Sequence, residues 1–284
     1  SNPSMFAWEK LKCPIHLEEI DRDRLYTVVQ MGVNKGRIPG SALALQDTSA
    51  LLTHFNLMAN DQDVLNAACV LFAKTPDKYH DQCKVRLGRF EGTNMSEFRD
   101  HTVCYGNLFE QYDAIINFCQ KHMFLAARMD EVERVETLTV PLKVVREATL
   151  NTIIHRDWDA YNLTPSVAIF DDRVEFQNPG DFPLGSTYMD YINNPHSSPV
   201  NPKIADVFFK SGLMEAWGRG IANIFEECEK YGLPVPEFKV GHRIVTLVIR
   251  FKNAIVPHKK GDEPVNEPVN EPVNEPVNEV LKEI

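Results

Sequence analysis

Apolar positions recur at helical spacing through the first part of the chain. The stretch HLEEIDRDRLYTVVQMG carries them near the 3.6-residue period, which predicts a helix ending at Gly32. Asp47 is a good N-cap for a second helix, DTSALLTHFNLM. A third helical pattern, DQDVLNAACVLFAK, is interrupted just beyond its end by Pro76. We therefore predict a small helical subdomain over residues 1–80.

The pattern changes near residue 82, where period-two alternation begins to mix with helical stretches. The clearest signal is PSVAIFDDRVEFQNPG, two β-rich runs around the polar pair Asp171-Asp172, which predicts a hairpin. Strands and helices follow an α+β order rather than strict βαβ alternation, over a domain spanning residues 81–253. The other expected strands or extended segments are CKVRLGRFEG, FLAARMDEVERVETLTV, PEFKV and RIVTLVIRF; the expected helices are GNLFEQYDAIINFCQKHM, PLKVVREATLNTIIHRDW and those near 202–212 and 217–232.

A low-complexity tail closes the chain. EPVN occurs four times over residues 263–278, and a proline at every fourth position forbids a continuous helix. We expect residues 254–284 to form an extended, polyproline-like linker that leads to a further C-terminal domain.

Composition narrows the class of protein. Hydrophobic residues make up 43% and charged residues 25%, which are ordinary globular values. No apolar run approaches the roughly 18 residues of a membrane span, and the N-terminal pattern predicts no secretion signal. The six cysteines include no CxxC pair, which favours reduced thiols in a cytoplasmic protein over a disulfide frame or a zinc site. His80 and Cys83 have the spacing of two metal ligands. Because no second pair accompanies them, we interpret them as surface residues.

The net charge of −10 argues against a broad nucleic-acid footprint on this chain. A role in DNA transactions would therefore require DNA contacts from domains missing from this sequence.

One predicted helix carries a row of polar residues. Glu147, Asn151 and His155 stand at i, i+4 and i+8 and so share one helical face. A held glutamate can act as a general base on water, and an asparagine offers the neutral oxygen that Mg²⁺ accepts. The alternative is a solvated Glu147, a locally hydrogen-bonded Asn151 and a structural His155. Spacing alone leaves both interpretations open.

Two glycine-containing stretches follow that helix. FQNPGDFPLG places Gly180 in a turn after a strand, where backbone can approach a ligand. EAWGRGIANIFEEC places Gly218 and Gly220 at a helix start, where backbone N–H groups favour phosphate. Arg219 between them offers a charge-assisted contact.

Three long stretches carry a family resemblance: PLKVVREATLNTIIHRDW, VAIFDDRVEFQNPGDFPLG and NPKIADVFFKSGLMEAWGRGIANIFEECEKYGLPVPEF. They resemble bacterial proteins labelled RecG-like or transcriptional regulators, over roughly residues 10–252. Such proteins pair a Schlafen-type AlbA DNA-binding domain with a domain similar to the GHKL ATPases (gyrase, MutL and histidine kinases). The resemblance implies a GHKL-like two-layer α/β sandwich with ATP and Mg²⁺ bound between helices and sheet.

Under this resemblance Glu147 is the general base and Asn151 the Mg²⁺ ligand. Asn178, Gly180 and Phe182 stand where the family carries D-x-G-x-G. Asn178 thereby replaces an aspartate that accepts from the adenine amino group, and the bulk of Phe182 replaces a glycine.

The remaining positions complete the implied nucleotide site. Gly218 and Gly220 take the place of the family's phosphate-binding glycines, Arg219 and His155 are further candidate ligand contacts, and residues 184–200 are available as a short lid. No Walker motif of the form G-x-x-x-x-G-K-[ST] is present in the sequence, which excludes a RecA-type motor in this chain.

Three functional hypotheses follow. The first is a cytoplasmic regulator of DNA transactions, especially transcription, whose eroded GHKL-like portion binds nucleotide or serves assembly. The second is a working Mg²⁺-dependent ATPase. The third is a structural dimerisation module with a vestigial pocket. Under this hypothesis the protein forms a homo-oligomer.

Overall fold

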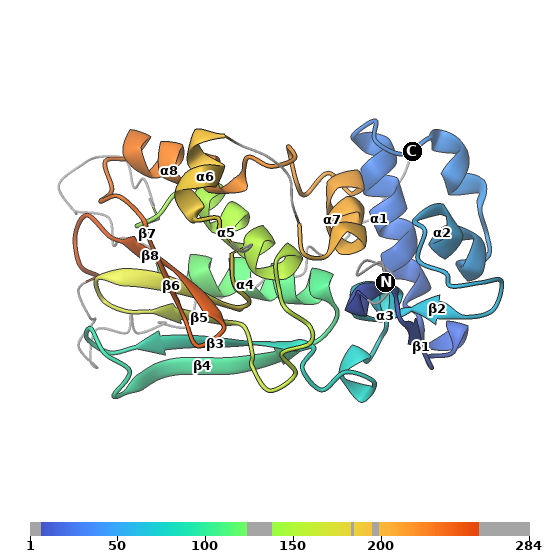
Figure 1. Ribbon diagram of the computed structural model, residues 1–284, viewed down its shortest axis with the longest axis horizontal. Coiled ribbons are helices and arrows are strands. Elements are labelled where there is room, and N and C mark those ends of the chain that lie inside the picture. Colours follow the sequence, from blue (N-terminus) through green and yellow to red (C-terminus); the bar gives the residue numbers. More distant parts are fainter. Residues whose placement is uncertain (1–6, 124–137, 183–184, 195–198, 256–284) are drawn as a thin grey trace, which may run out of the picture.

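The structure, a computed structural model, describes residues 7–123, 138–182, 185–194 and 199–255. A helical part from the first eighty residues lies beside a part in which helices cover a sheet, and α7 lies between them (Figure 1). In the helical part the elements are η2 (Trp8–Lys10), β1 (Lys12–Cys13), η3 (Leu17–Glu19), α1 (Arg22–Asn34), η4 (Gly40–Ala44), α2 (Thr48–His54), β2 (Val64–Leu65), α3 (Asn66–Phe72) and η5 (Pro76–Lys78).

A six-stranded mixed sheet forms the base of the second part. Its order is β4-β3-β5-β6-β8-β7, with β3 and β5 parallel and every other neighbouring pair antiparallel. The strands are β3 (Lys84–Phe90), β4 (Phe98–Tyr105), β5 (Ser166–Ile169), β6 (Arg173–Pro179), β7 (Glu237–Gly241) and β8 (Ile244–Arg250). The predicted hairpin is confirmed as β5 and β6, with Ile169 opposite Val174.

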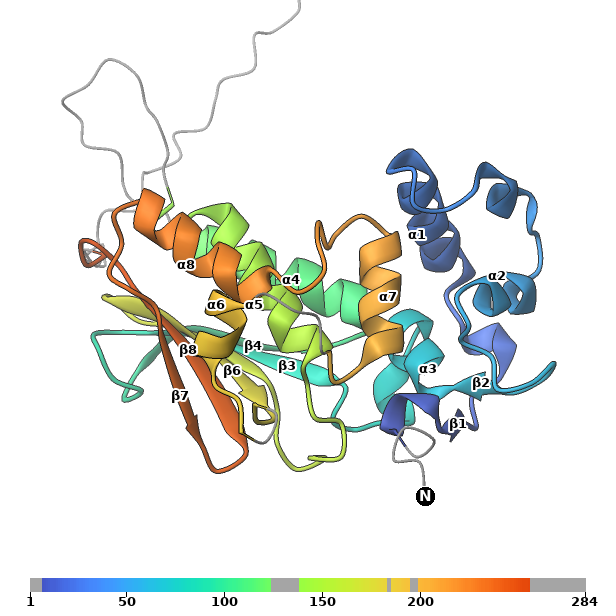
Figure 2. The ribbon, with the colours of Figure 1, turned by 45° about the horizontal axis from the view of Figure 1, so that its top comes forward.

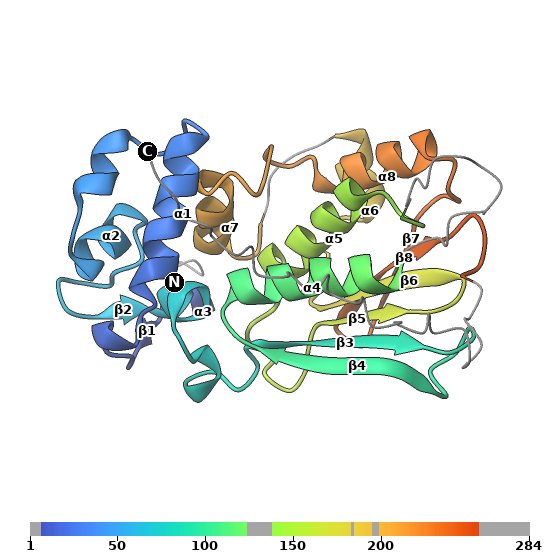
Figure 3. The same ribbon diagram turned by 180° about the vertical axis from the view of Figure 1, so that it is seen from behind.

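Helices cover one face of this sheet, which gives the predicted α+β sandwich of two layers (Figures 2 and 3). They are α4 (Leu108–His122), α5 (Leu142–Ile154), α6 (Tyr188–Asn193) and α8 (Gly220–Lys230), while α7 (Pro202–Lys210) packs towards α3. One hydrophobic cluster runs from Cys13 to Phe251 and includes buried side chains of both parts. Burial of this apolar surface is the main stabilising contribution to the fold.

Two helix starts agree with the capping residues in the sequence. Asp47 caps α2 by accepting from the Ala50 backbone N–H, as predicted, and Asp21 caps α1 in the same way. The predicted end of α1 at Gly32 is wrong, because the helix continues to Asn34. A side chain at Gly32 would lie 2.6 Å from the Lys210 carbonyl oxygen, so this glycine permits close packing instead of ending the helix.

Long-range contacts hold α7 to the N-terminal residues. The buried Glu9 carboxylate accepts from the backbone N–H groups of Lys203 and Ile204 at 2.9 and 3.1 Å. It thereby caps α7, whose own N-cap residue, Asn201, donates from its side chain to the Ile154 and Arg156 carbonyl oxygens instead of capping the helix. The Arg37 guanidinium donates to carbonyl oxygens just beyond the other end of this helix, including Met214.

The structure differs from the predicted elements at β4 and at the start of α3. Strand β4 was not predicted, because FRDHTVCY is mostly exposed and shows no apolar alternation. The third helix begins only at Asn66, since Val64 and Leu65 form β2 opposite β1. Residues 124–137 of the expected extended segment at 124–140 lie outside the described residues, as does the EPVN tail. Among the described residues, no helix is both long and apolar enough to cross a membrane.

Candidate active site at the start of helix α8

Helix α5 brings together the two residues expected to do chemistry. Its apolar residues, among them Val144 and Ala148, are buried, while Glu147 and Asn151 lie on the side that meets α8. A Cβ built on Gly220 would lie 3.1 Å from Asn151 Oδ1 and 3.2 Å from Glu147 Oε2. The predicted carboxylate, amide and helix start therefore meet at one place.

The Glu147 carboxyl group is held and partly desolvated. Its Oε1 accepts from Asn223 Nδ2, one turn into α8, at 3.4 Å. Burial raises the pKa of Glu147 above its ordinary 4.5 and the nearby Glu215 adds to this, whereas the hydrogen bond from Asn223 opposes it. A carboxylate whose pKa is raised in this way is better suited to accept a proton than an exposed glutamate.

A pH-dependent stability difference follows for Glu147→Gln. The folded protein binds this proton more tightly than the unfolded chain, so the wild type loses stability as the pH rises above about 4.5. The glutamine variant lacks this titration, and it can still accept from Asn223. We expect its free energy of unfolding to exceed that of the wild type by an amount that grows with pH and then levels off. Urea unfolding between about pH 4 and pH 8 measures this difference, and a constant difference would contradict it.

Two adjoining hollows lie beside Asn151. The first, the sheet-side pocket, lies between α5 and the sheet. Its empty volume is about 670 Å³, a value that includes the open solvent at its mouth. The second, the helix-side pocket, holds about 520 Å³ by the same measure and reaches Glu147, Gly218 and Gly220. Both include Asn151 and His155. The walls of the sheet-side pocket are largely apolar and include Phe176, Phe182, Tyr191, Ile221, Phe238 and Leu247.

Asn178 presents an unpaired acceptor in the sheet-side pocket. It stands near the end of β6 opposite Val245 of β8, and its side chain lines the pocket. The residue is 9% exposed, and its Oδ1 is buried without a hydrogen-bond partner among the described residues. Because an unsatisfied buried acceptor destabilises a fold by about 1–3 kcal/mol, it indicates a position where a ligand donor belongs.

His155 lies where α5 ends and lines both hollows. Its backbone N–H donates to Asn151 O, and burial lowers the pKa of its imidazole to about 4. The ring is therefore neutral at physiological pH, able to donate from one nitrogen and accept at the other. Gly180 packs against the His155 carbonyl oxygen, which a Cβ there would approach to 3.2 Å, and its φ of 151° suits glycine.

The predicted helix start is confirmed, with α8 beginning at Gly220. Its first turn has no side-chain cap, which leaves backbone N–H groups and the positive end of the helix dipole beside Asn151. Gly218 adopts φ 72° and lines the helix-side pocket. Arg219 is exposed, and its guanidinium pairs with Glu226 at 3.1 Å instead of lining either hollow.

Phe182 forms a wall of the sheet-side pocket rather than closing it. Its ring lies 5.6 Å from that of Phe238 and 5.9 Å from that of Tyr191. Tyr191 belongs to α6, within the stretch expected as a lid, of which residues 184 and 195–198 lie outside the described part. Asn223 and the aromatic walls were missed, because no spacing links them to Glu147 in the sequence.

Arg156 and Asp157, the two residues after His155, have different partners. Arg156 is buried, stacks 4.0 Å from the Trp158 ring and donates to backbone carbonyl oxygens of Gln82 and Lys84. Asp157 instead pairs with Arg243 at 2.8 Å. Each of these contacts ties the loop after α5 to another part of the chain. Arg156 can bond to two carbonyl oxygens because its guanidinium has donors on several sides.

One segment of this chain matches a protein-family model. Residues 163–249 match the family model described as "Putative ATP-dependent DNA helicase recG C-terminal". This stretch is less than a third of the chain; it includes Asn178, Gly180 and Gly220 but not α5 with Glu147 and Asn151. None of the curated proteins gives a match.

A solved structure extends the likeness to most of the fold. The crystal structure of the DIP2311 protein from Corynebacterium diphtheriae aligns with a TM-score of 0.67 at 19% identity. The alignment covers 88% of this chain and 48% of that one, so the chain spans about half the length of that protein. At this identity the likeness concerns the fold alone. The family match supports a RecG-related ATPase-type domain over residues 163–249.

Proposed function

We propose that the chain binds a purine nucleoside triphosphate, ATP, together with Mg²⁺ in the two hollows beside α5. The observation that carries this proposal is the unpaired Oδ1 of Asn178, buried in a pocket with aromatic walls. An adenine amino group would donate to this oxygen, while its ring would rest against the apolar walls. The position agrees with the aspartate of the GHKL resemblance, with an uncharged acceptor in its place.

The rest of the site suits the triphosphate and its metal ion. Asn151 offers a neutral oxygen ligand of the kind that Mg²⁺ accepts, and the bound ion would neutralise phosphate charge. The first turn of α8 offers backbone N–H groups for phosphate, and Gly220 keeps that approach free of a Cβ. Glu147 Oε2 lies 3.2 Å from the same Cβ position, so the carboxylate stands beside the start of α8, where it would face a water bound next to the phosphates.

The Gly220→Ala variant tests this arrangement. Its added methyl group would fill the space beside Asn151 and Glu147, so we expect ATP affinity to fall at least about tenfold, equal to about 1.4 kcal/mol. The helix itself should be unharmed, because Gly220 has no positive φ and alanine favours helices. Titration calorimetry and thermal unfolding give the two readouts. Gly241→Ala, where a Cβ meets nothing within 4 Å, is the matched control. Unchanged affinity in Gly220→Ala would contradict the proposed phosphate position.

ATP hydrolysis is the second candidate activity, and the raised pKa of Glu147 favours it. In this case Glu147 would take a proton from the attacking water, as a positioned general base. Phosphate release measured with the wild type and Glu147→Gln separates the two activities. Binding without turnover in either protein supports a sensor, whereas turnover lost only in Glu147→Gln supports an ATPase.

We propose further that the nucleotide site serves a regulator of DNA transactions, with transcription as the favoured process. The support is the resemblance to RecG-like regulators and the matched family description. Because the chain carries a net charge of −10, DNA contacts are assigned to other domains. Anisotropy of labelled duplex DNA with the full-length protein, with and without ATP, tests this role. If ATP does not change the DNA affinity and sedimentation shows a stable dimer, the structural dimerisation module is favoured.

A further inference from the structure

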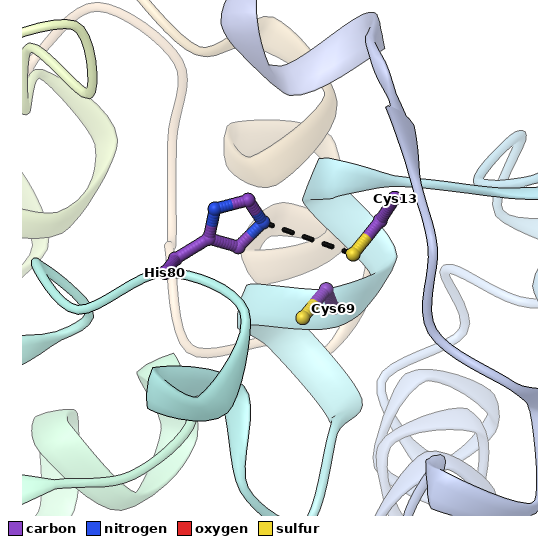
Figure 4. A group of neighbouring side chains, drawn as sticks. All are labelled: Cys13, Cys69 and His80. Carbon is purple, nitrogen blue, oxygen red and sulfur yellow. Dashed lines mark hydrogen bonds between the residues drawn. The ribbon is translucent and has the colours of Figure 1, made fainter.

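Three potential metal ligands from separate segments meet outside the nucleotide site. Cys13 lies in β1, Cys69 in α3, and His80 follows η5. Figure 4 shows the three side chains close together, with the His80 ring facing the Cys13 sulfur. Their ligand atoms all lie within 4.8 Å of one another, and Cys13 Sγ is 3.8 Å from His80 Nε2.

These distances are close to those that a bound zinc ion requires. Zn²⁺ binds cysteine sulfur at about 2.3 Å and histidine nitrogen at about 2.0–2.1 Å in tetrahedral sites. Two such ligands then stand roughly 3.5–3.8 Å apart. The Cys13–His80 pair already has this separation, and the Cys69 sulfur lies within 4.8 Å of both of those atoms.

The surroundings hold the ligands in position. Cys13 is 4% exposed and Cys69 is fully buried, whereas His80 is half-buried, so solvent has access from the histidine side. The Ile15 backbone N–H lies within hydrogen-bonding reach of the Cys13 sulfur. Trp8 packs edge-to-face on the His80 ring with centroids 4.7 Å apart. Contacts of this kind orient ligands in metal sites.

The backbone of each segment is tied down as well. Cys13 pairs with Val64 in the short β1–β2 ladder, and the His80 N–H donates to Pro76 O at 3.0 Å. The Trp8 ring that packs on His80 also stacks on Trp158 at 4.5 Å, beyond the end of α5. The cluster thus stands where the N-terminal residues, α3 and the approach to β3 converge.

We propose that Cys13, Cys69 and His80 bind one Zn²⁺ ion, with water as the fourth ligand. The ion joins β1, α3 and the segment after η5 in addition to their shared hydrophobic packing, so its role is to stabilise the helical part. Two sulfur ligands and one imidazole select a soft or borderline metal ion such as Zn²⁺ over Mg²⁺ or Ca²⁺. Cys83 takes no part, because its thiol donates to Gly106 O and accepts from Gln111.

The test is metal uptake by the reduced, chelator-treated protein. We expect one equivalent of Zn²⁺ in competition with a chromophoric chelator. Replacement by Co²⁺ should give a thiolate-to-cobalt charge-transfer band and the visible bands of a tetrahedral site. Cys69→Ser and His80→Ala should each weaken Zn²⁺ binding by more than about 100-fold, since loss of even an outer partner weakens it 10–100-fold. Cys104→Ser, at a half-buried thiol outside the cluster, should bind as the wild type does.

Several outcomes would overturn this proposal. The first is a wild-type protein that takes up no Zn²⁺, and the second is Zn²⁺ uptake that persists in Cys69→Ser. The third is a Cys13–Cys69 disulfide that forms in air in a protein that takes up no Zn²⁺. Because the cobalt spectrum of the wild type reports sulfur ligation directly, a variant that fails to fold does not leave the result undecided. Added Zn²⁺ should also raise the thermal midpoint of the wild type but not of His80→Ala, by preferential binding to the folded state.

Discussion

Replacing Asn178 by leucine is expected to remove most ATP binding and, at the same time, to stabilise the protein without ligand. In the part of the chain that the structure describes, the Asn178 Oδ1 is buried without a partner, so its removal relieves a desolvation penalty of about 1–3 kcal/mol. A leucine of similar size keeps the pocket wall filled but offers the adenine amino group no acceptor. We expect affinity to fall by about 10- to 100-fold, as for other sites built around a ligand hydrogen bond. Calorimetry and thermal unfolding measure the two effects.

The opposite signs of these two effects make the test selective. A merely structural asparagine would lower stability when replaced, and a vestigial pocket would leave ATP binding absent in both proteins. Gln177→Leu is the control, because this neighbouring side chain bonds to Ser166 on the other face of β6. It should lose a little stability and keep the ATP affinity of the wild type. Lower stability of Asn178→Leu with unchanged affinity would contradict the assignment.

The Gly32→Ala variant is expected to lower the free energy of unfolding by about 1–3 kcal/mol. A Cβ at this position would lie 2.3 Å from Ile38 Cδ1 and 2.6 Å from the Lys210 carbonyl oxygen. Ile38 can rotate, but Lys210 O belongs to the backbone at the end of α7, so α1 and α7 must separate. This strain outweighs the gain of about 1 kcal/mol in helix propensity.

Urea unfolding measures the loss, with Gly40→Ala as the control. A Cβ at Gly40 meets nothing within 4 Å, so that variant should differ little from the wild type. If Gly32→Ala is as stable as Gly40→Ala, the contact between α1 and α7 is looser than the structure has it. ATP affinity should change little in either variant, since both positions lie outside the two hollows.

Local sequence signals predicted the elements that depend on neighbouring residues. The cap at Asp47, the β5–β6 hairpin and helix α5 with Glu147 and Asn151 on one face agree with the structure. The helix ends at Ile154, earlier than predicted, so His155 lies just beyond it. Only the family resemblance predicted that Glu147 and Asn151 would lie beside Gly220, because Asn151 and Gly220 are 69 positions apart in the chain. The geometry of that meeting comes from packing of α8 on α5.

Other features left no local signal. Strand β4 forms because it pairs with β3, although its own residues are largely polar and exposed. Glu9 caps a helix that begins at Pro202, and no sequence spacing indicates such a partner. The Cys13, Cys69 and His80 cluster was missed for the same reason: scattered cysteines favour free thiols until the fold brings them together.

Titration calorimetry of ATP and Mg²⁺ into the wild-type protein and Asn151→Ala tests the central claim most directly. Asn151 lines both hollows and stands beside Gly220, so its removal should affect the metal ion and the triphosphate together. We predict saturable binding to the wild type that Asn151→Ala loses. Absence of heat at concentrations able to detect a Kd of about 1 mM, or equal binding by both proteins, would contradict nucleotide binding at this site.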